Sequence, residues 1–193
     1  TVTAAAATVP VAGELAVAAP VINTTAKSLL AGSATVSAGG DVTLDAATDT
    51  VVTATANGIN GGATAGTTSA IPTIVATTEA SIEGGAAVTA SDSLTVHAEA
   101  TGTITTTSSA TPAGGVSNPA SLTALNAATA AGAQTAAAAV AATTLTSTTR
   151  AFVDTTGAVV TAGALSLLAE SDFDVTTTAD GTPAVNADNV GFA

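Results

Sequence analysis

The chain has 193 residues, a formal net charge of -12 and only 8% charged residues. Two cations against fourteen carboxylates are too few to neutralise phosphates, which excludes nucleic acid and an anionic membrane surface as partners. Hydrophobic residues make up 47%, yet aromatic residues make up 2%, and tryptophan, tyrosine, methionine and cysteine are absent. Because wide cores rely on large side chains, this composition favours a thin layered interior, and it excludes disulfides and thiolate metal sites.

An alanine-rich stretch at residues 4–22 leads into the first of three similar segments, at residues 24–56. Within this segment Val42, Leu44 and Ala46 alternate with polar residues. A period of two, with abundant valine and threonine, predicts a half-buried strand rather than a helix. The glycine pair just before this strand predicts a tight turn between two short strands.

The same pattern returns at residues 76–107 and 147–179. The copies are 52 residues apart from Val36 to Val88, and then 72 residues apart from Val88 to Val160. The third copy has one extra residue before Val160 and lacks one residue shortly after it. Five sets of positions are equivalent in the three copies: Val36, Val88 and Val160; Ala38, Ala90 and Ala162; Val42, Leu94 and Leu165; Leu44, Val96 and Leu167; and Ala46, Ala98 and Ala169.

The longer interval contains an alanine-rich insert at residues 120–144. Alanine favours helix, whereas Gly132 and the threonines after Ala142 disfavour it, so both helix and strand stay open for the insert. The longest apolar run, residues 136–142, is shorter than the roughly 20 residues that span a bilayer, so we expect no membrane span. We expect one repetitive β domain over residues 1–193, as part of a longer chain or of a filament.

The repeated strands and turns predict an all-β fold. Stacked copies would form a β-solenoid, in which each layer buries its inward side chains against the next layer and the alanine-rich segment is an insert. The same strands are also compatible with a β-sandwich filament subunit.

Two stretches of the repeat point to a family. Residues 36–46, which read Val-Ser-Ala-Gly-Gly-Asp-Val-Thr-Leu-Asp-Ala, and residues 148–153 resemble the repeats of filamentous-haemagglutinin-like proteins and giant bacterial adhesins. The resemblance implies a secreted right-handed parallel β-helix with a structural or adhesive role at the cell surface. We expect its partners to be neighbouring repeats or other copies of the protein, and a cell-surface or carbohydrate receptor. It implies no catalytic residues.

Lys27, Glu79 and Arg150 occupy equivalent positions in the three copies. Stacking in sequence order would therefore place the Glu79 carboxylate between the two cations. We interpret this alternation as a structural charge ladder that sets the stacking register, with a ligand contact as the second interpretation. Because an exposed ion pair contributes only about 0–1 kcal/mol, the ladder would act on specificity rather than on stability.

His97 is the single histidine of the sequence, and the alternation places it on the outward face, opposite Asp45 of the first copy. No Ser–His–Asp or zinc-type spacing surrounds it, so we interpret it as a surface residue.

Asp172, Asp174 and Asp180 lie in a carboxylate-rich stretch and are secondary candidates for Ca²⁺ ligands. The sequence contains neither an EF-hand loop nor the glycine-rich calcium repeat, so solvated strand faces are the preferred interpretation. We expect no cofactor and no metal.

These features predict an extracellular structural or adhesive protein, part of a bacterial surface fibre or giant adhesin, and not an enzyme. Two alternatives come from other classes. One is a self-assembling pilin-like subunit joined by donor-strand exchange. The other is an ice- or carbohydrate-binding module, because the threonine triplets at residues 53–55, 103–107 and 176–178 would place hydroxyls on one strand face.

Overall fold

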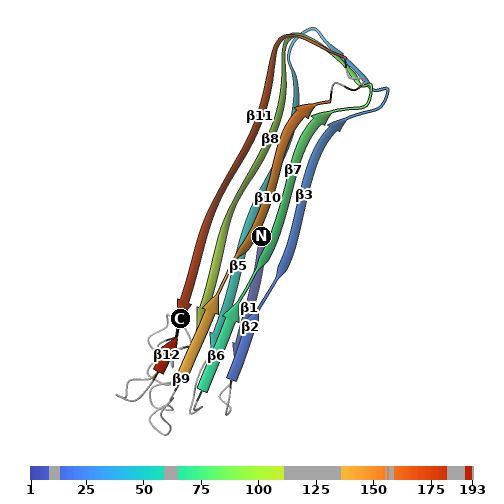
Figure 1. Cartoon of the computed structure of the whole chain (residues 1–193). Helices are drawn as coiled ribbons and strands as arrows, with labels where there is room; N and C mark the ends of the chain where they lie inside the picture. Colours follow the sequence, from blue (N-terminus) through green and yellow to red (C-terminus); the bar gives the residue numbers. More distant parts are fainter. Residues whose placement is uncertain are drawn as a thin grey trace.

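The computed structural model describes residues 1–8, 14–58, 65–110, 136–154, 156, 159–181 and 190–192. Within those residues every regular element is a β-strand, and long strands run side by side along the length of the molecule (Figure 1). The strands are β1 (Val2–Thr8), β2 (Glu14–Ala18), β3 (Val21–Leu30), β4 (Thr35–Ala38), β5 (Val42–Gly58), β6 (Ala65–Ala70), β7 (Thr73–Ile82), β8 (Ala87–Ser109), β9 (Ala136–Ala141), β10 (Thr144–Val153), β11 (Val159–Asp180) and β12 (Val190–Phe192).

The strands form three open sheets. Sheet A has the order β1-β5-β8-β11, and β4 also pairs with β8; sheet B is β12-β9-β6-β2, and sheet C is β10-β7-β3. Sheets B and C both pack against sheet A. All pairings between the described strands are parallel, unlike the antiparallel sheets of an immunoglobulin-type sandwich. The predicted all-β class is therefore confirmed.

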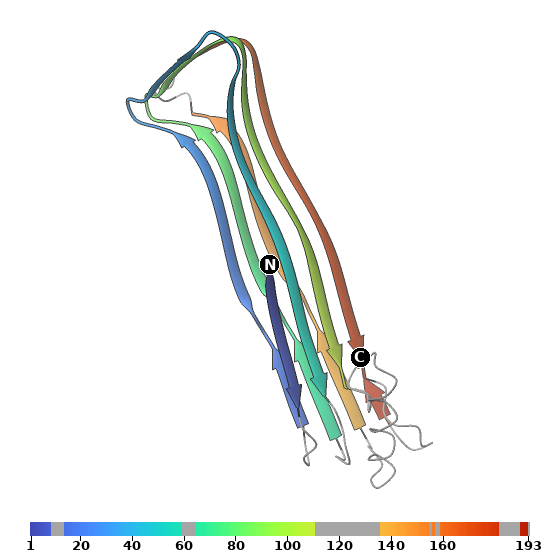
Figure 2. The same ribbon diagram turned by 180° about the vertical axis from the view of Figure 1, so that it is seen from behind.

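The chain passes three times along the molecule and back (Figure 2). We name these passages the first layer (14–58), the second layer (65–110) and the third layer (136–180). The second layer lies between the other two in sheet A and sheet C. Its strands are accordingly the best covered, because they pair on both sides.

The core lies between sheet A and the two sheets that face it. Its largest fully buried side chains include Ile74, Ile82, Leu94 and Ile104, and alanines fill most of the remaining inward positions. Phe152 and Phe173 are each only partly covered. The predicted thin interior of small aliphatic side chains is confirmed.

Hydroxyl groups bridge the two sides of this narrow interior. Thr48 and Thr78 form a hydrogen bond of 2.6 Å from sheet A to sheet C. Thr68 and Ser108 form a fully buried one of 2.7 Å from sheet B to sheet A. Because the hydroxyls of these two pairs are hydrogen-bonded, their threonine and serine residues enter the core without the desolvation cost of an unpaired polar group.

The strand register reproduces the equivalences predicted from the sequence. Val36 and Val160 both pair with Val88, and the later rows follow the same alignment. The register of β11 shifts between Ala162 and Ala164, at the residue that the third copy lacks. Gly163 lies at this point, where an added Cβ would be 2.6 Å from the Asp92 backbone oxygen, so the close approach requires glycine.

Most of the described residues of the alanine-rich segments lie in strands. Residues 136–141 form β9, which confirms the strand alternative there, while residues 120–135 of the predicted insert lie outside the described residues. β9 pairs with β6 along its whole length, and Ala139 is buried. Pairing and burial therefore override the helix propensity of alanine. The described part of the chain contains no helix with the length and apolar character needed to cross a bilayer.

Candidate functional site

The structure brings Lys27, Glu79 and Arg150 into one row across sheet C. Parallel pairing places Glu79 opposite both Lys27 and Arg150. Glu79 accepts a hydrogen bond of 3.1 Å from Lys27 Nζ, and its other carboxylate oxygen lies 3.7 Å from Arg150 Nη1. The Glu79 side chain is 14% exposed, against 52% for Lys27 and 58% for Arg150. One mostly covered carboxylate thus lies between two exposed cations and pairs with both.

Arg150 has a second contact that the sequence interpretation missed. Its guanidinium group lies 4.6 Å from the centre of the Phe152 ring. The two residues are separated by two positions on β10, so their side chains emerge on the same face of the strand. This spacing is the signal that could have revealed the contact. The ring and Glu79 together hold the cation at the edge of sheet C.

His97 joins three strands on the outer face of sheet A. Its Nδ1 lies 2.7 Å from Asp45 on β5, and its Nε2 lies 3.4 Å from Glu170 on β11. The Asp45 hydrogen bond is the main cause that raises the pKa of His97 above its usual 6.5; burial opposes this rise, and Glu170 adds to it. The contact with Asp45 follows the predicted register. The contact with Glu170 is diagonal, because the residue directly opposite His97 on β11 is Leu168.

Because both ring nitrogens of His97 face carboxylates, the imidazole would have to leave one of them before acting on a substrate. This arrangement favours a bridging role for His97 over a role as a general base.

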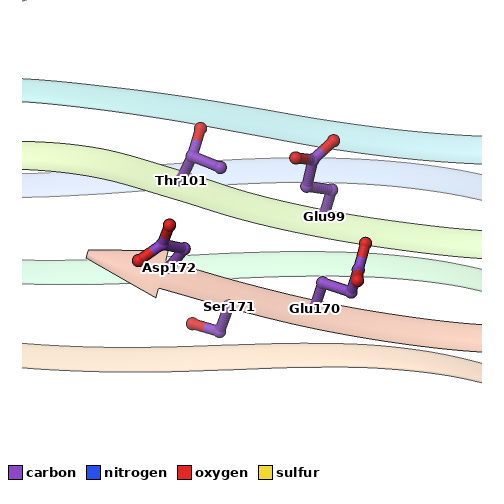
Figure 3. Close-up of a pocket in the computed structure, with 5 residues that line it drawn as sticks. All are labelled: Glu99, Thr101, Glu170, Ser171 and Asp172. Carbon is purple, nitrogen blue, oxygen red and sulfur yellow. The ribbon is translucent and has the colours of Figure 1, made fainter.

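An acidic hollow lies beside His97. Its lining residues are Glu99 and Thr101 on β8 and Glu170, Ser171 and Asp172 on β11. Figure 3 shows the two glutamates, Thr101 and Asp172 pointing to one side of the sheet, while Ser171 points to the other. Consistent with this direction, the Ser171 hydroxyl hydrogen-bonds with Ser147 of β10 at 3.2 Å.

Two of the three calcium candidates lie near this hollow. Asp172 and Asp174 line an adjoining depression together with Asp49. Asp180 lies at the end of β11, eight residues beyond Asp172, or roughly 26 Å along an extended strand. Within the described residues, no group of three or more carboxylate, imidazole or thiol side chains is placed to hold a metal ion. The structure thus brings Asp172 and Asp174 together and places Asp180 apart from them.

Threonines form two rows farther along the outer face of sheet A. Thr105 pairs with Thr53 and Thr176, and Thr107 pairs with Thr55 and Thr178. Neighbouring threonines in a row are one strand spacing apart, about 4.8 Å, and the two rows are two residues apart, about 6.6 Å. The predicted triplets therefore form a regular grid of hydroxyl and methyl groups.

Comparison of the chain with protein-family models, with curated protein sequences and with solved structures gives no match.

Proposed function

We propose that this chain is a structural segment of an extracellular fibre or giant surface adhesin, in which the layers wind as a right-handed parallel β-solenoid. The observation that carries the proposal is the in-register parallel stacking of three similar layers, with equivalent valines, leucines and alanines above one another. Connections between parallel strands are almost always right-handed, which supports the proposed hand.

Such a segment functions through its shape. Its layers repeat the same inward side chains, so a protein of this kind lengthens by adding layers without changing its cross-section. Hydrogen bonds between the strands of successive layers run along this direction of growth and stiffen it, and the outer faces are available for attachment.

Immunogold electron microscopy tests this function. Antibodies raised against the purified chain should label fibres or extended projections on intact cells that produce the protein. Label confined to the cell interior would contradict the proposal. Spontaneous polymerisation of the purified chain into filaments would instead favour the pilin-like subunit that exchanges a donor strand.

The threonine grid supports a second candidate function, binding to an ordered surface such as ice or a crystalline polysaccharide. Thr53, Thr105 and Thr176 present equivalent groups at regular spacing, which is the property that recognition of a repeating lattice requires. Thermal hysteresis of the purified chain tests the ice alternative. The expected result is a lowered freezing point that Thr105→Lys abolishes, and the absence of hysteresis in the parent chain would eliminate ice binding.

A further inference from the structure

The third layer exposes the row of apolar side chains that the second layer buries. Leu165, Leu167 and Val175 on β11 are 53%, 46% and 43% exposed. Their partners on β8 are completely buried: Leu94, Val96 and Ile104 are each 0% exposed. Because burial of apolar surface is favourable, covering this row of side chains would stabilise the molecule.

The same edge of the molecule also offers strand pairing. Among the described residues, β10 pairs only with β7 and β11 pairs only with β8 over the part that contains the exposed row. An edge strand presents backbone donors and acceptors to a further strand. Backbone pairing and apolar burial are therefore available together along the third layer.

Charge specifies which kind of strand can pair with β10 at this edge. The row in sheet C alternates cation, carboxylate and cation, and it ends on Arg150, which Glu79 and Phe152 hold in place. A carboxylate on the added strand would continue the alternation, whereas a cation directly opposite Arg150 would be repelled.

The opposite edge of the same chain does not meet this requirement. Stacking β3 of a second copy in register on β10 would place Lys27 beside Arg150. In sheet A, β1 already covers Val52 to Gly58 of β5, so β5 of a second copy is not free along its whole length. Head-to-tail addition of identical copies is therefore disfavoured by charge and by shape.

We infer that the β10–β11 edge binds a strand–corner–strand segment of the second-layer type, with a carboxylate opposite Arg150 and apolar residues opposite Leu165, Leu167 and Val175. This inference rests on the proposed structural function, because such a segment is what a further layer of the rod would provide. The second layer itself has the required pattern, with Glu79 opposite Arg150 and its apolar residues opposite the exposed row.

A synthetic peptide of residues 71–105, labelled with a fluorophore, serves as the probe. Fluorescence anisotropy should show saturable binding of the peptide to the purified chain. Arg150→Glu should weaken binding on the order of fivefold, because the peptide then meets a like charge. A peptide with Glu79→Lys should restore binding to the Arg150→Glu chain and bind the parent chain poorly.

Two controls complete the design. Lys27→Glu changes the charge of the other edge. The loss of peptide affinity caused by Arg150→Glu should therefore be the same with and without Lys27→Glu. Circular dichroism and melting temperature show whether each variant is folded. Arg150→Gln removes the positive charge without reversing it, and so separates loss of attraction from repulsion. Absence of peptide binding, or binding that ignores every change at Arg150, would overturn the inference. Labelled surface fibres without peptide binding would support the structural function and overturn the inference about the β10–β11 edge. Peptide binding without labelled fibres would support the binding edge and contradict the structural function.

Discussion

Gly102 shows how closely the side chains of neighbouring layers are matched. It lies between Thr50 and Phe173, and an added Cβ would be 2.4 Å from the Thr50 backbone oxygen and 2.8 Å from a Phe173 ring carbon. We expect Gly102→Ala to lower the free energy of unfolding by about 1–3 kcal/mol through overpacking. Chemical denaturation measures the effect. The matched control is Gly40→Ala, where the nearest atom is 3.8 Å away; equal losses at the two sites would contradict this reason.

Thr149 is the exception to the paired hydroxyls of the interior. Its Oγ1 is buried without a hydrogen-bond partner among the described residues, whereas the equivalent Thr78 bonds to Thr48. The residue of the second layer that corresponds to Thr48 is Ala100, which has no hydroxyl to offer.

Replacing each threonine by valine tests this difference. Thr149→Val should raise the melting temperature, because it removes an unpaired buried hydroxyl that costs about 1–3 kcal/mol. Thr78→Val should lower the melting temperature, because it leaves Thr48 without its partner. A stabilising Thr78→Val or a destabilising Thr149→Val would show that the hydroxyl pairs do not determine the outcome.

His97 should make stability depend on pH. Its pKa is raised in the folded state, chiefly by the hydrogen bond with Asp45, so protonation favours folding. The stability from His97 is therefore complete below its unfolded pKa, near 6.5, and is lost as pH rises through the higher folded pKa. Urea denaturation of the parent chain and of His97→Gln should show a difference that shrinks from acidic to mildly alkaline pH. A stability difference between the parent chain and His97→Gln that grows with pH would contradict this role of the His97–Asp45 hydrogen bond.

At the scale of the strand, Glu79 connects β7 to both neighbours in sheet C. We expect Glu79→Gln to destabilise the chain by about 1 kcal/mol, because two ion pairs of modest strength are lost. Glu79→Lys should cost more, because three cations would then lie side by side. Melting curves at low and high salt provide the measurement, and the gap between the two variants should narrow as salt screens the charges. An unchanged gap would remove the charge ladder as its cause.

The strands and their register could be predicted from the sequence because their information is local. Alternation of apolar and polar residues fixes which face of a strand is buried, and a slip by one residue would reverse it. The equivalence of Val36, Val88 and Val160 was readable for this reason. Even the irregularity at Gly163 was visible as a residue that the third copy lacks.

Other features depend on contacts between distant residues, and no local pattern predicts them. β9 consists almost entirely of alanine, and its pairing with β6 and β12 makes it a strand. The bridge from His97 to Glu170 runs diagonally between strands, so an alignment of directly opposite residues could not identify it.

At the scale of the whole molecule, open sheets A and C leave two different edges. One edge is formed by the third layer, with Arg150 and the exposed leucines of β11. The other is formed by β3, with Lys27, and by β1, which covers part of β5. Natural β proteins place charges on exposed edges to prevent uncontrolled pairing. In-register stacking of these two edges would place Lys27 beside Arg150, so this charge pattern disfavours pairing between identical copies.

The scarcity of cations has a further consequence, for the resistance of the molecule to digestion. Trypsin cleaves after lysine and arginine, and the sequence offers it only Lys27 and Arg150. Both peptide bonds lie inside paired strands of sheet C, and a protease must pull a segment out of its sheet before cutting it. We expect the folded chain to survive trypsin and the urea-unfolded chain to yield three fragments. Rapid cleavage at Arg150 under native conditions would show that β10 detaches readily.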